Sequence, residues 1–401
     1  MSMLPIFRER LTRSFAFQPM VVTPMPKIRV LVVDDSVVIR RMVSDVLSGE
    51  PDIEVAGAAA DGRIALQKID QVNPDILTLD VEMPVLDGLE TLRQLRKTHR
   101  HLPVIMFSTL TERGASATMD ALALGASDYV TKPANVGSAA AALEKIRAEL
   151  IPKIRAHVPR AATSAVRPFT LTSAQMAQLP SVLSSPRAVT SRVEVVAIGT
   201  STGGPNALGD LVPLLPPNFP VPVVIVQHMP PIFTKFLADR LSSKSQIPVM
   251  EAANHQELLP GHAYIAPGDF HMTVERSKEG MRIRTQQEQP ENSCRPSVDV
   301  LFRSVADEYQ GDALAVIMTG MGQDGLRGCG RIRERGGQIL AQDEATSVVW
   351  GMPGYVANAG LADAVLPLGL IAGEIVRRVA VGRVPASRPR LSYFLDSRSA
   401  R

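Results

Sequence analysis

The sequence has few cysteines, few aromatic residues and no long apolar run. Its two cysteines, Cys294 and Cys329, are too few for a disulfide framework and fit a reducing compartment. No apolar stretch reaches the roughly 18 residues that cross a bilayer. Charged residues interrupt the first 27 positions, so a secretory signal is not expected either. These absences predict a cytoplasmic protein without membrane insertion, whose cores are built mainly from aliphatic side chains.

Charge is distributed unevenly along the 401 residues. The formal net charge is +3, but residues 1–27, 151–192 and 380–401 hold four, six and five basic residues against one, none and one acidic residue. The rest of the sequence is therefore acidic. A nucleic-acid-binding domain normally shows the reverse, a basic surface. The pattern disfavours a DNA-binding output domain, and we expect no nucleic-acid partner.

Two series of alternating strand and helix patterns run along the chain. Short apolar segments rich in β-branched residues predict the strands of the first series at 28–33, 53–58, 75–79, 104–107 and 127–130. Helical periodicity between them is clearest at 37–47, 64–69 and 89–95. The second series predicts strands at 195–199, 222–227, 263–266, 313–319 and 338–341. Such alternation favours two α/β domains, each with a doubly wound parallel sheet.

Composition sets the expected boundaries. Proline, alanine, serine and arginine dominate the stretch between the two series, which cannot bury enough apolar surface to offset its ordering entropy. We therefore expect a disordered extension at 1–27, a first domain at 28–150, a linker at 151–192, a second domain at 193–382 and a basic tail at 383–401.

Three acidic residues fall at the ends of predicted strands in the first domain. Asp34 and Asp35 follow the first strand, and Asp80 follows the third. Ligands bind at the carboxyl ends of strands in such sheets, and three converging carboxylates suit Mg²⁺. Ser108 and Lys132, at the ends of the fourth and fifth strands, add a hydroxyl and a cation. The set predicts a carboxylate nucleophile beside a metal ion.

With the segments VLVVDDS, LTLDVEMPVLDG, MFST and DYVTKP, residues 28–150 closely resemble the two-component receiver family, which has a flavodoxin-like fold. The resemblance implies that Asp80 is phosphorylated by a histidine kinase and that Asp34 and Asp35 help to hold Mg²⁺. Ser108 and Lys132 would bind the phosphoryl group. Tyr129 occupies the family's switch position, unless it is simply a half-buried sheet residue.

In the second domain, VVAIGTSTGGP places Ser201 directly after a predicted strand, between Gly199 and Gly203. Small residues allow a sharp turn from strand to helix that exposes the hydroxyl, and free N–H groups there stabilise developing negative charge. Taken alone, the segment is equally compatible with a glycine-rich anion loop or a tight turn.

Two further residues favour a serine hydrolase. His228 directly follows the predicted strand at 222–227, and Asp324 follows the one at 313–319. A histidine there can remove the proton of Ser201, and an aspartate can orient the imidazole. The chain order serine, histidine, aspartate differs from the order serine, acid, histidine of the α/β-hydrolase fold. We therefore expect an α/β serine esterase of a different fold.

The segments AIGTSTGGP, VIVQHMP, AYIAPGDFHM, CRPSVDVLF, MTGMGQDG and WGMPGYV resemble the catalytic domain of the chemotaxis protein-glutamate methylesterase family, CheB. The resemblance implies hydrolysis of glutamate γ-methyl esters on chemoreceptors, often with deamidation of glutamines, by Ser201, His228 and Asp324. Backbone N–H groups near Thr202 and Met321 are the candidates for an oxyanion hole. It further implies that the unphosphorylated receiver covers the esterase cleft.

Other features support weaker interpretations. His255, His262 and His271 match no metal-ligand spacing, so we expect no cofactor in the esterase site. Cys294 is interpreted as a packed thiol rather than a nucleophile. Two alternative functions remain open from sequence: an esterase of a sensory pathway other than chemotaxis, and a receiver-driven regulator without catalysis.

Overall fold

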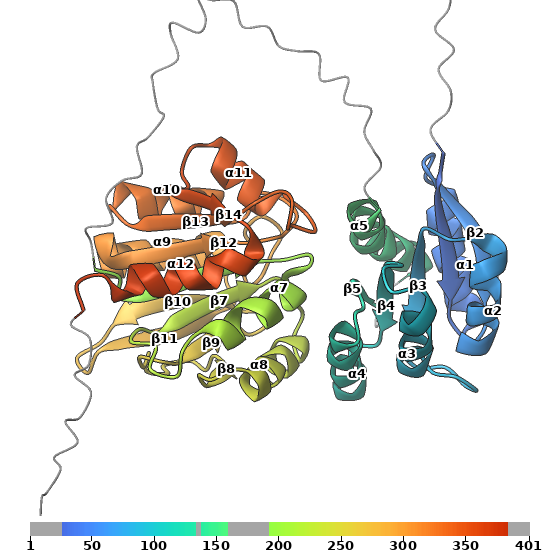
Figure 1. The fold of residues 1–401 in the computed structure, drawn as a ribbon, viewed down its shortest axis with the longest axis horizontal. Helices are drawn as coiled ribbons and strands as arrows, with labels where there is room; N and C mark the ends of the chain where they lie inside the picture. Colours follow the sequence, from blue (N-terminus) through green and yellow to red (C-terminus); the bar gives the residue numbers. More distant parts are fainter. Residues whose placement is uncertain (1–25, 134–137, 159–191, 384–401) are drawn as a thin grey trace, which may run out of the picture.

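The structure is a computed structural model that describes residues 26–133, 138–158 and 192–383. These residues form two α/β domains that lie beside one another (Figure 1). The expected N-terminal extension and basic tail, and most of the expected linker, lie outside the described residues. In the part of the chain that is described, no helix combines the length and apolar character needed to cross a membrane.

The N-terminal domain is a parallel sheet in the order β2-β1-β3-β4-β5. Its strands are β1 (Ile28–Val33), β2 (Ile53–Ala59), β3 (Ile76–Asp80), β4 (Val104–Ser108) and β5 (Asp128–Thr131). Its helices are α1 (Val37–Ser48), α2 (Gly62–Val72), α3 (Gly88–Thr98), α4 (Glu112–Ala123) and α5 (Ala139–His157). The five strands expected from sequence are all present, with ends that differ by no more than one residue.

Alternate side chains of β1 point to opposite faces of this sheet. Val30 and Val32 join the core beneath α1 and α5, whereas Leu31 and Val33 join the core beneath α2, α3 and α4. Helices therefore bury both faces, which explains why the strands read as continuous apolar runs.

Helix α5 runs beyond the domain end expected at residue 150. It continues to His157, and Ile151 and Ile154 are buried. Pro152, which suggested a linker, lies inside the helix. A proline removes one N–H donor, but here the helical spacing of buried isoleucines outweighs that local cost. Residues 151–157 thus belong to the first domain.

The C-terminal domain is a parallel sheet in the order β14-β13-β12-β6-β7-β9-β8. Its strands are β6 (Val195–Thr200), β7 (Val223–Gln227), β8 (Val249–Glu251), β9 (Ala263–Ile265), β12 (Ala313–Ile317), β13 (Gln338–Gln342) and β14 (Ala364–Leu366). Its helices are α7 (Gly204–Leu211), α8 (Phe233–Lys244), α9 (Val298–Tyr309), α10 (Leu326–Glu334), α11 (Met352–Asn358) and α12 (Leu368–Ala380). An antiparallel hairpin, β10 (His271–Arg276) and β11 (Met281–Gln286), is added to this sheet domain.

The sequence predicts five of the seven parallel strands of this sheet, including the three-residue β9, and misses four other strands. Strands β8 and β14 also have three residues each, but they lie at the sheet edges and are only partly buried, whereas β9 is fully buried. The hairpin strands β10 and β11 alternate polar and apolar residues, and the prediction relied on continuous apolar runs. The missed strands lie at the sheet edges and in the hairpin, so the prediction of a doubly wound core is unaffected.

The two domains contact one another through α4 of the first and α8 of the second (Figure 1). Tyr129, in β5, stacks on Phe233 at the start of α8, with ring centroids 5.1 Å apart and planes 14° from parallel. Asn206, in α7, donates a side-chain hydrogen bond of 3.1 Å to the carbonyl oxygen of Ala126. An aromatic stack and a polar contact therefore join the domains.

Candidate active site and phosphorylation site

The C-terminal sheet reverses its direction of growth at β6. From β6 the chain continues through β7 on one side, and it returns later through β12 on the other. A crevice forms outside the carboxyl ends of parallel strands at such a point. Ser201 follows β6, His228 follows β7, and Asp324 lies in the loop after β12. The topology thus brings the three residues to one crevice.

Ser201 sits in a tight turn between β6 and α7. Its N–H donates to the carbonyl of Thr319 at 3.0 Å, and its own carbonyl accepts from Gly204 at 2.8 Å. Gly320 lies so close that a Cβ there would be 2.8 Å from the Ser201 Cβ. Within the described residues, the Ser201 hydroxyl has no hydrogen-bond partner. The turn is held on both sides, and the hydroxyl is left free.

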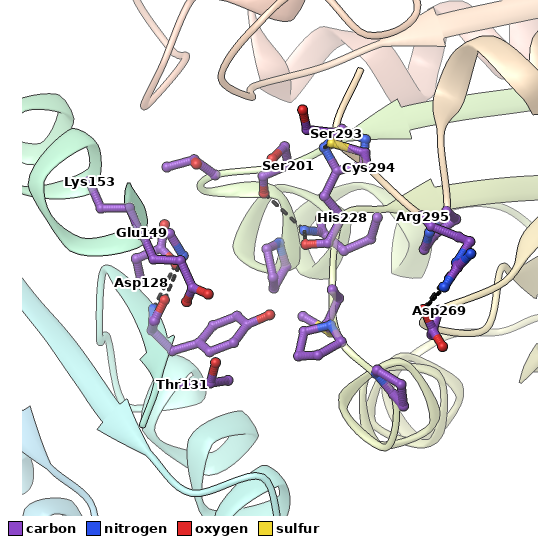
Figure 2. Close-up of a pocket in the computed structure, with 18 of the residues that line it drawn as sticks. Asp128, Thr131, Glu149, Lys153, Ser201, His228, Asp269, Ser293, Cys294 and Arg295 are labelled. Carbon is purple, nitrogen blue, oxygen red and sulfur yellow. Dashed lines mark hydrogen bonds and ion pairs between the residues drawn. The ribbon is translucent and has the colours of Figure 1, made fainter. Parts of the chain in front are cut away.

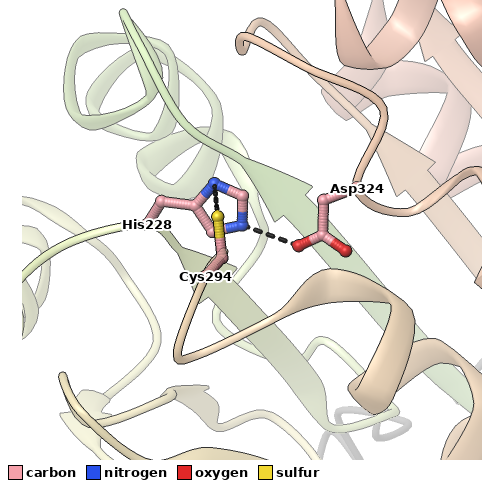
Figure 3. A group of neighbouring side chains, drawn as sticks. All are labelled: His228, Cys294 and Asp324. Carbon is pink, nitrogen blue, oxygen red and sulfur yellow. Dashed lines mark hydrogen bonds and ion pairs between the residues drawn. The ribbon is translucent and has the colours of Figure 1, made fainter. Parts of the chain in front are cut away.

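His228 is linked to the acid rather than to the serine in this structure. Its Nε2 lies 2.7 Å from Asp324 Oδ2, and its Nδ1 lies 3.6 Å from Cys294 Sγ (Figure 3). Burial lowers the pKa of His228, but the hydrogen bonds to Asp324 and Cys294 outweigh it and raise the pKa to about 10. Burial raises the pKa of Asp324, but its bond to His228 and backbone donors bring it down to about 2. Each partner therefore stabilises the charged form of the other.

Asp324 is held in place at the beginning of α9. Its oxygens accept from the backbone N–H groups of Val298, Asp299 and Gly325 at 2.7, 3.0 and 3.1 Å. Side-chain donors add the Ser297 hydroxyl at 2.8 Å and the Asn292 amide at 2.8 Å. A helix N-terminus favours negative charge, so the carboxylate is stabilised as an anion. The network fixes the orientation in which Asp324 meets His228.

The two backbone groups expected to form an oxyanion hole flank the serine turn. Neither the N–H of Thr202 nor that of Met321 has a hydrogen-bond partner among the described residues. Thr202 is buried, whereas Met321 is exposed. Unpartnered N–H groups beside a nucleophile are suited to a developing oxyanion. Their role stays a prediction.

Cys294 differs from its sequence interpretation. The structure places its thiol 3.6 Å from His228 Nδ1, in a partly exposed position that lines the crevice. Cys329, by contrast, is fully buried in α10. The interpretation of Cys294 as a packed thiol is therefore wrong, because the loop that carries it approaches the site only in the folded domain.

The crevice opens onto the receiver domain (Figure 2). A cavity of about 490 Å³ has Ser201, His228 and Cys294 on one wall. The opposite wall comes from β5 and α5 of the receiver, including Tyr129 and Lys153. Ser201, His228 and Cys294 therefore face the first domain across a shared cleft.

In the receiver, the strand-end acids meet as predicted. Asp34 and Asp80 are buried, and Lys132 Nζ lies 2.9 and 2.7 Å from one oxygen of each. Oxygens of these two acids and of Asp35 lie within 4.8 Å of one another. Burial raises the pKa of Asp80 to about 6 and also raises that of Asp34, although Lys132 acts in the opposite direction. The one positive charge of Lys132 thus does not fully neutralise the two carboxylates of Asp34 and Asp80.

This donor set fits a divalent cation. Three carboxylates supply hard oxygen ligands of the kind that Mg²⁺ prefers, and a dication would supply the missing positive charge. The receiver is therefore suited to Mg²⁺, with Asp34, Asp35 and Asp80 as the residues that would hold it.

Ser108 lies at the end of β4 and Tyr129 lies in β5, as the sequence predicts, but the contacts of both side chains are not evident from sequence. The Ser108 hydroxyl donates to the carbonyl of Gly114 in α4 at 3.0 Å, so it is engaged with a helix rather than with Asp80. Tyr129 is buried rather than half-buried, because Phe233 of the other domain covers its ring. Both residues thus connect the acid site to elements of the domain contact.

The three histidines that suggested a metal site from sequence lie apart from the crevice residues His228 and Cys294. Buried His271 accepts a hydrogen bond from the Ser297 N–H at Nδ1 and lies 3.1 Å from the Gln289 carbonyl at Nε2. Within the described residues, two clusters have metal-ligating side chains close together: the three receiver acids, and His228 with Cys294 and Asp324. His255, His262 and His271 belong to neither cluster.

Comparison with known proteins gives consistent matches for both domains. Residues 196–375 match the CheB methylesterase family, and residues 30–144 match the response regulator receiver domain. A protein-glutamate methylesterase/protein-glutamine glutaminase of Trichodesmium erythraeum is 57% identical over 360 residues, which are 88% of this chain and 100% of that protein. A protein of the same name from Nocardioides sp. is 54% identical, over 90% of this chain and 99% of its own length.

Among solved structures, the crystal structure of the Thermotoga maritima CheB methylesterase catalytic domain is 44% identical, with a TM-score of 0.46. It covers 46% of this chain and 98% of that chain. A receiver domain facing a serine-hydrolase crevice defines a response regulator with an enzymatic output domain. The chain belongs to the protein-glutamate methylesterase/protein-glutamine glutaminase family, and it is an enzyme of that family.

Three elements of the site were not found from sequence. Asn292 and Ser297 orient Asp324, and Phe233 joins the two domains. Ser297 lies within the segment CRPSVDVLF, whose resemblance to the family could have drawn attention to it. Asn292 and Phe233 carry no local signal, because their partners are distant in the chain.

Proposed function

We propose that this enzyme hydrolyses glutamate γ-methyl esters on chemoreceptors, and deamidates selected glutamines, with Ser201, His228 and Asp324 as its catalytic triad. The contact of 2.7 Å between His228 and Asp324, beside the strand end that carries Ser201, is the observation that supports it most directly. The names of the relatives supply the substrate class.

In this proposal Ser201 Oγ attacks the ester carbonyl while His228 takes the hydroxyl proton. Because Nε2 is engaged by Asp324, Nδ1 is the nitrogen that accepts this proton. Asp324 then stabilises the imidazolium. The imidazolium returns the proton to the leaving oxygen, so that methanol departs from an acyl-serine. A water molecule, deprotonated by the same imidazole, releases the glutamate. With glutamine as substrate, ammonia departs instead.

Negative charge develops on the carbonyl oxygen during both steps. The free N–H groups of Thr202 and Met321 are proposed to receive it. Removal of one such donor costs about 10²–10³ in kcat in other hydrolases. Backbone donors on two different turns, after β6 and after β12, would keep the hole rigid.

The receiver is proposed to control this chemistry through Asp80. A chemotaxis histidine kinase would donate the phosphoryl group, which Ser108 and Lys132 would bind. Asp34, Asp35 and Asp80 would hold Mg²⁺, which would supply positive charge to neutralise phosphoryl oxygens.

Once Ser108 turns from α4 to the phosphoryl group, the helix and Tyr129 lose their present contacts. The domain contact is modest, so a differential stability of a few kcal/mol shifts its population and opens the cleft. The same proposal places the enzyme in the cytoplasm, where its phosphodonor acts.

The test is methyl release from chemoreceptor membranes carrying labelled methyl esters. Full-length protein should release methanol, and acetyl phosphate with Mg²⁺ should accelerate release. Ser201→Ala should lower the rate by several orders of magnitude, because triad members act as a unit. Methanol release above a tenth of the wild-type rate in Ser201→Ala would remove Ser201 from the role of nucleophile.

A further inference from the structure

The crevice contains a thiol and an imidazole arranged as a pair of metal ligands. We propose that Cys294 Sγ and His228 Nδ1 bind a borderline-soft divalent ion of the Zn²⁺ type, and that the bound ion switches the esterase off. The binding site rests on geometry alone, whereas the inhibition rests on the function proposed above.

The separation of the two atoms is the first argument. Zn²⁺ lies about 2.3 Å from a thiolate sulfur and about 2.0–2.1 Å from an imidazole nitrogen. At a tetrahedral angle these lengths put sulfur and nitrogen about 3.5 Å apart. Cys294 Sγ and His228 Nδ1 are 3.6 Å apart (Figure 3). The ion therefore fits with little movement of either side chain.

The second argument concerns the other nitrogen of the ring. Histidines that bind metal donate their second N–H to a carboxylate or carbonyl, which fixes the tautomer and raises basicity. His228 Nε2 makes this bond to Asp324 Oδ2 at 2.7 Å. Asp324 itself accepts hydrogen bonds from five further donors, so it is saturated and acts as the orienting group rather than as a ligand.

The third argument is that the thiol is placed by a rigid turn. Glu291 and Cys294 exchange backbone hydrogen bonds of 3.1 and 2.9 Å. The two residues between them, Asn292 and Ser293, have φ values of 52° and 61°, as in a type I′ turn. On the other side, Arg295 pairs with Asp269 at 2.6 Å. The position of Cys294 is therefore set before any ion arrives.

Access and chemistry complete the site. Cys294 and His228 line the cleft with Ser201 (Figure 2), and its volume of about 490 Å³ has room for an ion and for the water at its remaining positions. The thiol loses its proton on binding, and thiolate with imidazole selects Zn²⁺ over Mg²⁺. An ion on Nδ1 occupies the nitrogen that takes the Ser201 proton, which is why methyl release would stop.

The binding test uses Co²⁺ as a spectroscopic substitute on the full-length protein, with excess Mg²⁺ present to occupy the receiver acids. A tetrahedral site with a thiolate should give a near-ultraviolet sulfur-to-cobalt charge-transfer band that Zn²⁺ abolishes. The band should be lost in Cys294→Ser and kept in the matched control Cys329→Ser, whose thiol is buried elsewhere. Absence of the band, or its survival in Cys294→Ser, would overturn the site.

The activity test compares each variant with its own metal-free rate. Zn²⁺ should inhibit methyl release, and EDTA should restore it. The half-inhibitory concentration should rise at least about tenfold in Cys294→Ser and stay unchanged in Cys329→Ser, because the lost thiolate is one of two protein ligands. Equal inhibition of both variants would overturn the proposal. A thiolate band in a protein that releases no methanol even when it is metal-free would instead refute the proposed function and leave the site standing.

Discussion

Tyr129 of the receiver stacks on Phe233 of the catalytic domain, with ring centroids 5.1 Å apart and planes 14° from parallel. Lys153 lies 4.8 Å from the centre of the Tyr129 ring, so the aromatic pair carries a cation beside it. Tyr129 also lies in β5, the strand that leads to Lys132 in the acid site. The stack therefore joins the candidate phosphorylation site to the wall of the esterase cleft.

Replacement of Phe233 by leucine should raise the unstimulated rate of methyl release. Leucine keeps most of the buried apolar volume but loses the aromatic stack, which is worth about 0.5–1.5 kcal/mol beyond its buried area. The open population, and with it kcat/KM, should rise about two- to twelvefold. Leu370→Ala, at an exposed position of α12, serves as a control and should leave the rate unchanged. A Phe233→Leu enzyme no faster than wild type would show that the stack does not restrain the domains.

Asp80→Asn should preserve the basal esterase activity and abolish its stimulation by phosphorylation. The amide is nearly isosteric with the carboxylate but accepts no stable phosphoryl group. Basal methyl release should persist, while stimulation by acetyl phosphate and Mg²⁺ should vanish. Removal of Mg²⁺ with EDTA should have the same effect on the wild type. Stimulation that survives in Asp80→Asn would place the phosphorylation site elsewhere.

The pH dependence of kcat/KM should reflect the partners of His228. The base works only when neutral, and hydrogen bonds to Asp324 and Cys294 raise its pKa from the ordinary 6.5 to about 10 despite burial. Activity should therefore still be rising above pH 6.5 in metal-free buffer. Cys294→Ala removes one of the raising contacts, so its acidic limb should move to lower pH. Cys329→Ala should not shift the limb, and an unshifted limb in Cys294→Ala would contradict the assignment.

Ser297→Ala should lower the stability of the catalytic domain. It removes a hydroxyl that donates to Asp324 at 2.8 Å, and hydrogen bonds to charged groups contribute about 1.5–3 kcal/mol. Urea unfolding can be followed by the fluorescence of Trp350, the one tryptophan of the sequence, which lies in this domain. Ser243→Ala, which removes a bond to a backbone carbonyl on the surface of α8, is the control and should have little effect. A free energy of unfolding equal to that of Ser243→Ala would argue against the network.

Local patterns explain how much of this molecule the sequence predicts. Strands that are buried on both faces are continuous apolar runs, and residues that follow them must meet at one edge of the sheet. That reasoning is enough to predict that Asp34 lies near Asp80 and that Ser201 and His228 lie at the same end of their sheet. It needs no knowledge of loops or of the other domain.

The residues that sequence did not reveal depend on contacts between distant segments. Asn292 reaches the site through the turn that Glu291 and Cys294 close, and no local pattern identifies it. Cys294 lies in the segment CRPSVDVLF, but that segment does not reveal the contact of its thiol with His228. From sequence, Phe233 resembles an ordinary core residue at the start of a helix, because its contact with the receiver is visible only in the folded protein. The domain boundary predicted at residue 150 is too early, because Pro152 has a strong local preference that burial of Ile151 and Ile154 overrides.

The position of Asp324 has a consequence for how relatives of this enzyme diverge. Its carboxylate satisfies the first backbone N–H groups of α9, which no side chain of that helix caps. Selection for a folded domain is therefore enough to retain it, even in a lineage that no longer needs hydrolysis. Ser201, whose hydroxyl supports nothing else in the described structure, is free to change in such a lineage. In a divergent sequence, the presence of the serine therefore indicates an active hydrolase, whereas the presence of the aspartate indicates only that the fold is retained.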